Sequence, residues 1–374
     1  MSTKFTPLLL VLLMSFSAQS NQHLLAGNEA LQRKDYALAF TLFSDAAAQG
    51  ELDAQFNLGL MYKHGLGTNV DYGKAAIWFG NAAKRGHAAS QTQLGLLYVN
   101  GLGVTADIPK AVSLFERAAK QGFAAAQFQL GTHYREGAGV KQSLTKMFEL
   151  YLKAANAGLA FAQYNLALAY SKGAGTDIDL EQAAHWHKAA AAQGSLEATV
   201  ALGVLYLHGK GVTQDKQRAF ELFQSAAERG SAHAQLSLGN LYTDGKGVKK
   251  DLKQAFEWYK KSAEQGVAVA QHNMGAAYES GYGVEKNELE AAHWYRKAAK
   301  QGYAGAQTAL STMYIFGRGV KKDSKEAEYW ARKAAMQGNA HAQNNLGEMY
   351  KQGMGVERDY QLALKWYKKS AHQG

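Results

Sequence analysis

The chain has 374 residues, enough for two or three ordinary domains or for one long array of repeats. It contains 39 Gly but only 2 Pro, which is typical of a helical chain that ends its helices with glycine. The absence of Cys excludes disulfides, thiolate metal sites and a cysteine nucleophile, while the net charge of +10 allows an anionic partner without identifying one.

Residues 1–20 have the features of a secretory signal peptide. Lys4 precedes the apolar run PLLLVLLMSFS, and the small residues Ala18 and Ser20 favour cleavage after Ser20. The run is too short for a comfortable membrane span. We therefore expect an exported protein, periplasmic or secreted, with no transmembrane span and no nucleic acid as partner.

Residues 21–50 lack the Gly-x-Gly loop that marks the rest of the chain. The segment GNEALQRKDYALAFTLFSDAAAQG resembles an ordinary tetratricopeptide unit. Terminal repeats of such arrays usually need a polar outer face. We expect residues 21–50 to form N-terminal cap helices.

Residues 51–374 repeat nine times with a period of 36 residues, without insertion or deletion. Tyr recurs in one column from Tyr62 to Tyr350, and all six Trp occupy another column in which Leu114, Leu150 and Leu222 take the remaining places. A fixed period of this length indicates a stacked-repeat solenoid. The glycines that follow Ala-Ala-x-x or Ser-Ala-x-x stand at positions 50, 86, 122, 158, 194, 230, 266, 302, 338 and 374.

Each repeat is predicted to form two helices. In the first repeat, DAQFNLGLMYKH places Ala54, Leu58 and Tyr62 four residues apart, and YGKAAIWFGNAAKR has a similar apolar face that includes Trp78. One helix pair cannot bury its apolar face alone, so neighbouring pairs must stack.

A Gly-x-Gly motif such as Gly65 and Gly67 stands between the two helices of every repeat. Glycines before a helix can bind phosphate, but here Asp71 follows as a helix N-cap, and the motif occurs nine times. The pattern favours a structural turn that ends the first helix.

The repeat resembles the Sel-one-like repeat family, as in AQLSLGNLYTDGKGVKKDLKQAFEWYKKSAEQG at residues 234–266. The resemblance covers residues 51–374 and extends in a looser form over residues 22–50. It implies a right-handed α/α superhelix that is used to hold other proteins. Together with the period, we expect an all-α solenoid of nine helix-pair repeats that acts as a non-enzymatic protein–protein interaction scaffold, without a cofactor or metal. Family members resemble envelope adaptors, signalling scaffolds and exported host-interaction proteins.

Two features bear on catalysis or metal binding. Ser143 and Lys146 match the Ser-x-x-Lys motif of penicillin-recognising enzymes, yet both stand in columns of the repeat, and neither Ser-Asp-Asn nor Lys-Thr-Gly occurs. His185 and His187 flank a Trp in a predicted helix, where a spacing of two places them on different faces. We interpret both histidines as helix-surface residues.

Columns that vary between repeats can carry function. On the first helix of each pair, which should line the concave surface, an apolar strip covers repeats one to six and then fades. An alternative is that these side chains pack on neighbouring repeats. The predicted protein-binding residues of this concave groove are Phe56, Leu60, Leu96, Val99, Phe128, Tyr164, Leu168, Val200, Val204, Leu207 and Leu236.

A column of amides accompanies the strip. Side-chain amides can bind an extended peptide backbone, or they can join helices within the scaffold, and both interpretations stay open. The column consists of Asn57, Gln93, Gln129, Asn165, Asn273 and Asn345.

Basic residues gather in the inter-helix loops of residues 231–374, where Lys and Arg outnumber Asp and Glu. They predict an anionic-partner ridge that could meet cell-wall glycan, although a solvated loop edge is the alternative. The residues of this basic ridge are Lys246, Lys249, Lys250, Arg318, Lys321 and Lys322.

The sequence therefore predicts a protein-binding scaffold or adaptor of the bacterial cell envelope, which holds partner segments in its concave groove. The alternative is a cell-wall-active protein, either a β-lactamase-like enzyme or a peptidoglycan or glycan binder. Self-association through the C-terminal end is a further alternative, because no polar capping helix is evident there.

Overall fold

The computed structural model describes residues 21–373, so the predicted signal peptide and its cleavage after Ser20 lie outside the described residues. Over residues 21–373, regular secondary structure is helical throughout. No helix in this range has both the length and the apolar character needed to cross a bilayer. The predicted all-α solenoid is confirmed.

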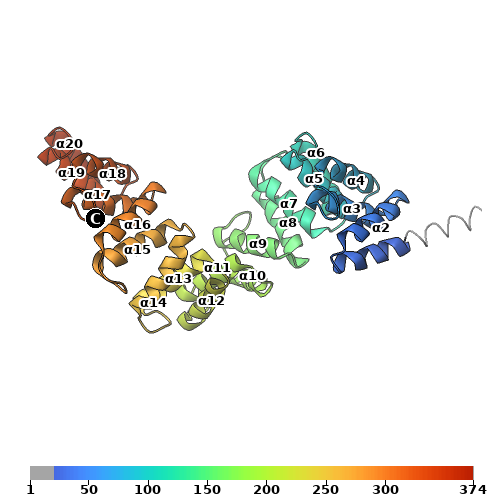
Figure 1. Ribbon diagram of the computed structural model, residues 1–374, viewed down its shortest axis with the longest axis horizontal. Helices are drawn as coiled ribbons and strands as arrows, with labels where there is room; N and C mark the ends of the chain where they lie inside the picture. The colour runs from blue at the N-terminus through green and yellow to red at the C-terminus, as the bar shows by residue number, and fades with distance from the viewer. Residues whose placement is uncertain (1–20, 374) are drawn as a thin grey trace, which may run out of the picture. The chain divides into compact units, whose positions relative to one another are not determined.

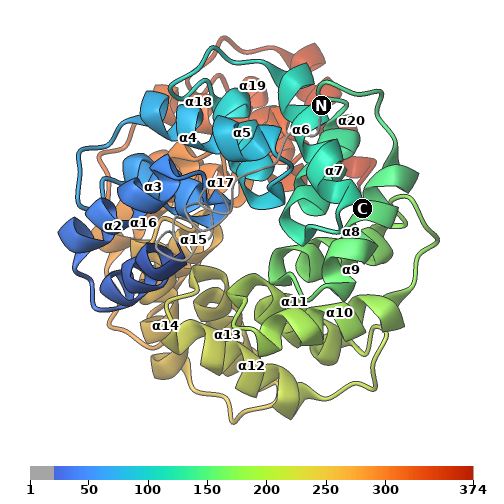
Figure 2. The same cartoon turned by 90° about the vertical axis from the view of Figure 1, so that its right-hand side faces the viewer.

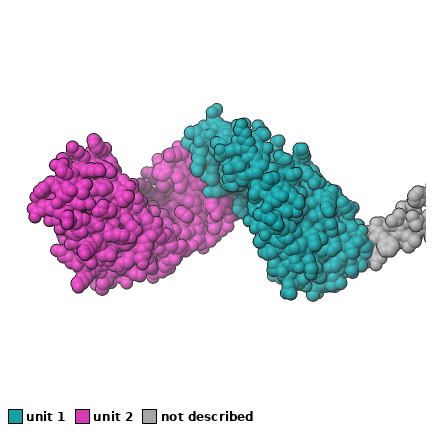
Figure 3. Space-filling view, turned by 90° about the horizontal axis from the view of Figure 1, so that it is seen from above, with its two compact units in different colours: residues 1–193 teal, residues 194–374 magenta. Residues whose placement is uncertain are grey.

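The chain divides into two compact units, unit 1 up to Gln193 and unit 2 from Gly194 (Figure 3). After a helical stretch over residues 21–32, unit 1 contains α2 (Tyr36–Ala48), α3 (Leu52–His64), α4 (Tyr72–Lys84), α5 (Ala88–Asn100), α6 (Ile108–Lys120), α7 (Ala124–Glu136), α8 (Leu144–Asn156), α9 (Ala160–Lys172) and α10 (Leu180–Ala192) (Figure 1). Unit 2 contains α11 (Leu196–His208), α12 (Lys216–Glu228), α13 (Ala232–Asp244), α14 (Leu252–Glu264), α15 (Ala268–Ser280), α16 (Glu288–Lys300), α17 (Ala304–Phe316), α18 (Ser324–Met336), α19 (Ala340–Gln352) and α20 (Tyr360–Ala371).

Within each unit, every helix packs against the next one along the chain. From α3 onward, odd-numbered helices are the first helices of the repeats and even-numbered helices are the second helices. In unit 1, the first helices α5 and α7 also contact each other across the intervening α6. Figure 2 shows α3, α5 and α7 on the inner side of the curve that unit 1 describes, with α4 and α6 further out.

The Gly-x-Gly motif is a structural turn, as predicted. Gly65 ends α3 with φ of +68°, and Gly67 has the same φ. A Cβ on Gly67 would lie 2.1 Å from the carbonyl oxygen of Tyr36, so the second glycine lets the loop approach the preceding repeat. The Asp71 carboxylate accepts a hydrogen bond of 2.9 Å from the backbone N–H of Lys74, which is an N-cap. The same cap recurs at Asp107, Ser143, Asp179, Asp215, Asp251, Asn287, Asp323 and Asp359.

A glycine in the first helix faces an aromatic ring in the second. A Cβ on Gly59 would lie 2.5 Å from Cε1 of Phe79, a residue with no exposed surface. Where the ring is smaller, the facing residue is larger, as in the column-equivalent pair Ala167 and His187. This exchange of volume keeps the packing of each helix pair dense.

Buried glutamines connect successive repeats. The side-chain N–H of Gln91 donates to the carbonyl of Ala83 (3.1 Å) at the end of α4, where backbone carbonyls have no partner within the helix. The Gln91 Oε1 in turn accepts a hydrogen bond of 3.1 Å from Gln121. We call each Gln–Gln contact of this kind an amide rung. Further rungs join Gln193 to Gln163, Gln265 to Gln235, Gln301 to Gln271, Gln337 to Gln307 and Gln373 to Gln343.

Candidate protein-binding surface

The predicted groove residues lie on first helices, and the structure places most of them at intermediate depth. Val204 on α11 is 40% exposed, whereas the other ten are half-buried. Phe56 and Leu60 pack against the core between α4 and α5, and Leu96 and Val99 against the next core. Apart from Val204, the predicted groove residues are therefore partly covered by their neighbours and do not project into solvent.

Aromatic contacts explain why the larger groove residues are only partly exposed. The Phe128 ring stacks on Tyr151 with 5.2 Å between centroids, and Tyr164 lies 5.6 Å from His187. Such pairs add to the stability of a core beyond the area that they bury. Phe128 and Tyr164 thus pack against core residues and are partly exposed to solvent.

His187 corrects one prediction, because it is a core residue and not a helix-surface residue. It is 2% exposed and occupies the aromatic column of Phe79 and Tyr151. Burial lowers its pKa from the usual 6.5 to about 4, so the ring is neutral near pH 7. His185 is exposed, as expected for its different face.

The amide column makes mixed contacts. Asn57 donates to Asn28 (3.2 Å) in the preceding repeat, and Gln93 accepts from Lys63 (2.9 Å). Asn165 instead donates to the carbonyl of Phe161 (2.8 Å) within its own helix. The members do not form a continuous ladder. The buried glutamines that do form rungs occupy a different column, two residues earlier in the same helix.

Two pockets in unit 2 bring first-helix residues together. A hollow of about 460 Å³ across α11 and α13 is lined by Val204 and Leu207 and by three residues absent from the sequence prediction, Asn240, Thr243 and Tyr259. The Tyr259 hydroxyl donates to Asn240 (2.8 Å) and lies 3.0 Å from the Thr243 hydroxyl. Burial raises the pKa of Tyr259, so it remains a neutral phenol.

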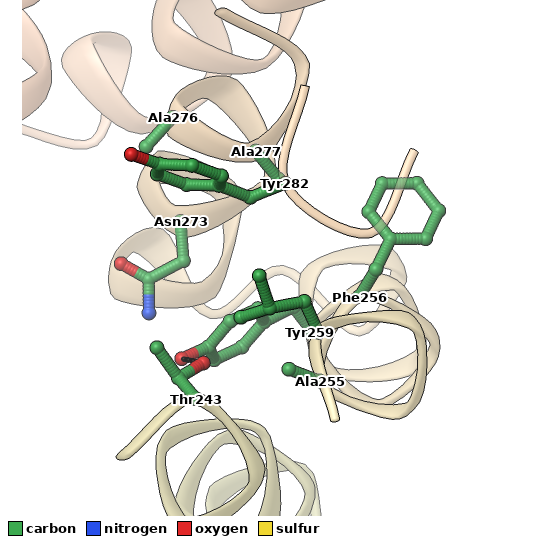
Figure 4. A pocket seen from close by; sticks show the side chains of 9 residues that line it. Thr243, Ala255, Phe256, Tyr259, Asn273, Ala276, Ala277 and Tyr282 are labelled. Carbon is green, nitrogen blue, oxygen red and sulfur yellow. Dashed lines mark hydrogen bonds between the residues drawn. The ribbon is translucent and has the colours of Figure 1, made fainter. Parts of the chain in front are cut away.

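A smaller pocket of about 140 Å³ adjoins this hollow and shares Thr243, Tyr259 and Asn273 with it. Figure 4 shows the Thr243 and Asn273 side chains directed toward the Tyr259 ring, with Tyr282 on the opposite side. Polar groups at the edge of an apolar pocket can orient a bound segment. No periodic signal reveals this cluster, because Asn240 and Thr243 stand in columns that change from repeat to repeat.

The last three repeats carry hydrogen-bonded ion pairs where the apolar strip fades. The Tyr295 hydroxyl donates to Glu279 (2.8 Å), and Glu279 also pairs with Arg318 (3.3 Å). Burial and that carboxylate raise the pKa of Tyr295. In a separate recurring contact, Arg296 donates to the Tyr314 hydroxyl (3.1 Å) and Arg332, one repeat later, donates to the Tyr350 hydroxyl (2.8 Å).

The predicted basic ridge is only partly available to an anion. Lys246 pairs with Asp244 at 2.7 Å, and Arg318 is the partner of Glu279 described above. Lys249, Lys250, Lys321 and Lys322 are exposed, and none of these four has an ion pair among the described residues. Four solvated lysines from two loops form a weaker feature than the sequence suggested.

Ser143 and Lys146 have structural partners. The Ser143 hydroxyl accepts from the backbone N–H of Lys146 (3.3 Å) as the N-cap of α8. The Lys146 ammonium lies 4.9 Å from the Tyr134 ring centroid, just as Lys110 lies 4.3 Å from Tyr98. The pair thus repeats an arrangement of the solenoid.

A family model described as Sel1 repeat matches ten segments, residues 22–51, 52–87, 88–123, 124–159, 160–195, 196–231, 232–267, 268–303, 304–339 and 340–374. The family model matches residues 22–51 as a tenth repeat, in addition to the nine predicted full repeats and at the segment where a looser resemblance was expected. Their packing agrees, because a Cβ on Gly27 would lie 2.6 Å from Phe43 as in the later repeats.

Two crystal structures are similar over most of the chain. One is a protective antigen present in uropathogenic Escherichia coli strains, which displays an SLR fold. It is 34% identical, with a TM-score of 0.66 over 98% of this chain and 87% of that one. The other is a Sel1 repeat protein from Oxalobacter formigenes, also 34% identical, with a TM-score of 0.62 over 79% of this chain and 86% of that one. None of the curated proteins matches the chain.

Proposed function

The chain belongs to the Sel1 repeat family, whose members mediate protein–protein interaction and are generally not enzymes, and we propose that it is a scaffold of the bacterial cell envelope. Its first-helix surface holds an extended or helical segment of a partner protein. The signal-like residues 1–20 support the envelope as its location. The protective antigen among its relatives is compatible with export.

The hollow across α11 and α13 is the observation that carries this proposal. Val204 and Leu207 provide apolar surface, while Asn240 and Asn273 provide amide groups at its edge. A partner side chain that enters this hollow would bury apolar area, and its backbone would meet hydrogen-bonding groups. Pockets that combine both kinds of group favour recognition of one oriented segment.

The test is affinity capture from an envelope extract with the full chain and two variants. Val204→Asp places a charge in the hollow at a position that is already 40% exposed, so the fold should tolerate it. Leu289→Asp makes the same change at a 72% exposed position at the start of α16, outside the first-helix surface. We expect a partner that is captured by wild type and Leu289→Asp and lost with Val204→Asp.

Equal capture by all three chains would contradict the first-helix surface as the binding site. Salt-sensitive sedimentation of the chain with cell-wall sacculi, together with no captured protein, would instead favour a glycan binder that uses Lys249, Lys250, Lys321 and Lys322. Circular dichroism melting of each variant checks that the loss does not come from unfolding.

A further inference from the structure

Two hollows open on the second-helix side of unit 1, away from the first-helix residues discussed above. Hollow A, of about 790 Å³, lies between α4 and α6 and includes Ile77, Gly80, Leu114 and Arg117 in its lining. Hollow B, of about 350 Å³, lies one repeat further, between α6 and α8, with Leu150 and Lys153 in its lining. Figure 1 shows these three second helices in sequence order within unit 1.

Both hollows occur where the Trp column contains leucine. Elsewhere this column fills the contact with the preceding repeat, and Trp294 and Trp330 are only 9% and 8% exposed. Trp294 packs against the core of α14 and α15, and Leu114 packs against the equivalent core of α4 and α5. Because leucine lacks the indole, hollow A opens at the place where Trp294 and Trp330 bury a ring in their own repeats. Leu222 in unit 2 is the third leucine of the column.

A cation that normally covers the indole is still present in both hollows. The Lys261 and Lys297 ammonium groups lie 4.1 and 4.2 Å from the ring centroids of the tryptophans three residues earlier. Arg117 and Lys153 occupy the same column, three residues after Leu114 and Leu150, where leucine takes the place of the indole. The Arg117 guanidinium donates to the carbonyl of Ala83 (3.3 Å) near the end of α4. A cation over an aromatic face is a stabilising pair, so these two positions are suited to receive a ring.

Hollow A is further opened by Gly80 in the middle of α4. The other repeats have Glu, Leu, Lys, Gln or Arg in this column. A Cβ on Gly80 would meet no atom within 4 Å, so no close packing requires glycine, which is an unfavourable residue inside a helix. Ile77 beside it is 61% exposed, an apolar side chain at the rim of an open hollow.

The charge around hollow A indicates what kind of segment it suits. Lys84, Lys110 and Arg117 contribute to its lining, and no carboxylate does. Hollow B is less selective, because Glu116 and Glu149 stand beside Lys120, Lys146 and Lys153 in its lining. Carboxylates that flank a bound aromatic residue would meet favourable potential at hollow A.

We propose that hollow A binds an aromatic side chain of an acidic protein segment, with the ring beneath Arg117 in the place of the missing tryptophan. The apolar floor of Ala76 and Leu114 packs against the ring, and Lys84 and Lys110 attract the flanking carboxylates. Hollow B offers a second, weaker position one repeat away. This site goes beyond the proposed function, because it uses second helices and a different unit.

The experiment measures fluorescence anisotropy of labelled seven-residue peptides with the full chain. The probe is Asp-Glu-Asp-Trp-Asp-Glu-Asp, and the comparison peptides replace Trp by Ala or all acidic residues by Lys. We expect both comparison peptides to bind at least about tenfold more weakly than the probe. Equal binding of the Ala peptide would overturn the proposal, since it would show attraction by charge alone, as would no binding of the probe.

Variants of the chain locate the site. Leu114→Trp restores the residue of six other repeats and fills hollow A, so affinity for the probe should fall about tenfold. Arg117→Ala should weaken binding about fivefold. Lys74→Ala is the control of equal charge, because Lys74 lies over Tyr62 outside the hollow and its loss should leave affinity unchanged.

Unchanged affinity in Leu114→Trp would overturn the proposal, provided that its helical melting matches wild type. If that variant does not fold, Gly80→Leu provides the same test, because the equivalent Leu152 is compatible with its helix. Val204→Asp should bind the probe like wild type. The site in unit 1 and the first-helix surface can therefore fail independently.

Discussion

Unit 1 and unit 2 are built from the same repeat but depart from it in different places. Unit 2 has Leu222 in the Trp column of its first repeat but keeps Trp258, Trp294, Trp330 and Trp366 in the next four, and its amide rungs run without a gap from Gln235 to Gln373. Unit 1 has Leu114 and Leu150 in the Trp column and lacks two of the rungs. The difference shows that a residue of the repeat pattern can be replaced in single repeats, and that a smaller replacement leaves an open hollow between neighbouring helices.

The first helices of the two units also differ, in the polarity of the side chains that they present. In unit 1 they present half-buried apolar side chains such as Phe56 and Phe128, which rest on aromatic partners. In the last repeats of unit 2, Glu279, Arg318 and Tyr295 form a hydrogen-bonded network instead. A partner that binds by apolar contact would therefore find more surface before these repeats than on them.

The comparison predicts that the Trp column contributes most to stability in unit 2. Trp294→Leu replaces a buried indole by the leucine found at position 114 and leaves a cavity. This cavity should lower the free energy of unfolding by about 2–3 kcal/mol. Urea unfolding followed by circular dichroism measures the loss. Trp366→Leu is the matched control, because Trp366 in α20 is less buried and its replacement should cost clearly less. Equal costs would mean that burial of the column does not distinguish the repeats.

The second prediction concerns acid stability, because unit 1 has His187 where most repeats have Phe or Tyr. The folded pKa of about 4 lies below the usual 6.5, so the unfolded chain binds the proton more tightly. His187 therefore supports stability above pH 6.5, and this contribution is lost as the pH falls toward 4. The shift corresponds to at most about 3 kcal/mol.

The variant His187→Phe with Ala167→Gly restores the Gly–ring pair of the other repeats and should reduce the stability lost between pH 7 and pH 4. Urea unfolding midpoints of both chains at the two pH values measure this. Some dependence on pH should remain, because burial also lowers the pKa of His272 in unit 2. An unchanged pH dependence would show that His187 is protonated without cost in the folded chain.

The smallest expected effect is the repair of an amide rung in unit 1. The Oε1 of Gln127 is buried without a hydrogen-bond partner, and the position that carries Gln in complete rungs is Ala157. Ala157→Gln should supply the missing donor and stabilise the chain by about 0.5–1.5 kcal/mol. Thermal melting measures the gain. Ala157→Glu has a similar length without the amide donor, so a gain of equal size from it would contradict the explanation.

The sequence by itself determined the period, the helix pairs and their ends. A glycine such as Gly65 and a cap such as Asp71 act on backbone groups within a few residues, so the local pattern is sufficient to predict them. The stacking of repeats follows from the period, because a helix pair with one apolar face needs a neighbour.

Only the tertiary structure decided the depth of each column and the contacts between helices. Gly59 meets a ring 20 residues later, Gln121 reaches Gln91 in the preceding repeat, and His187 lies in the core although its neighbour His185 is exposed. The same reason explains why the groove residues are half-buried and why hollow A exists. A repeat pattern shows which positions share a face, but the burial of a side chain depends on the volume of residues that a separate helix places against it.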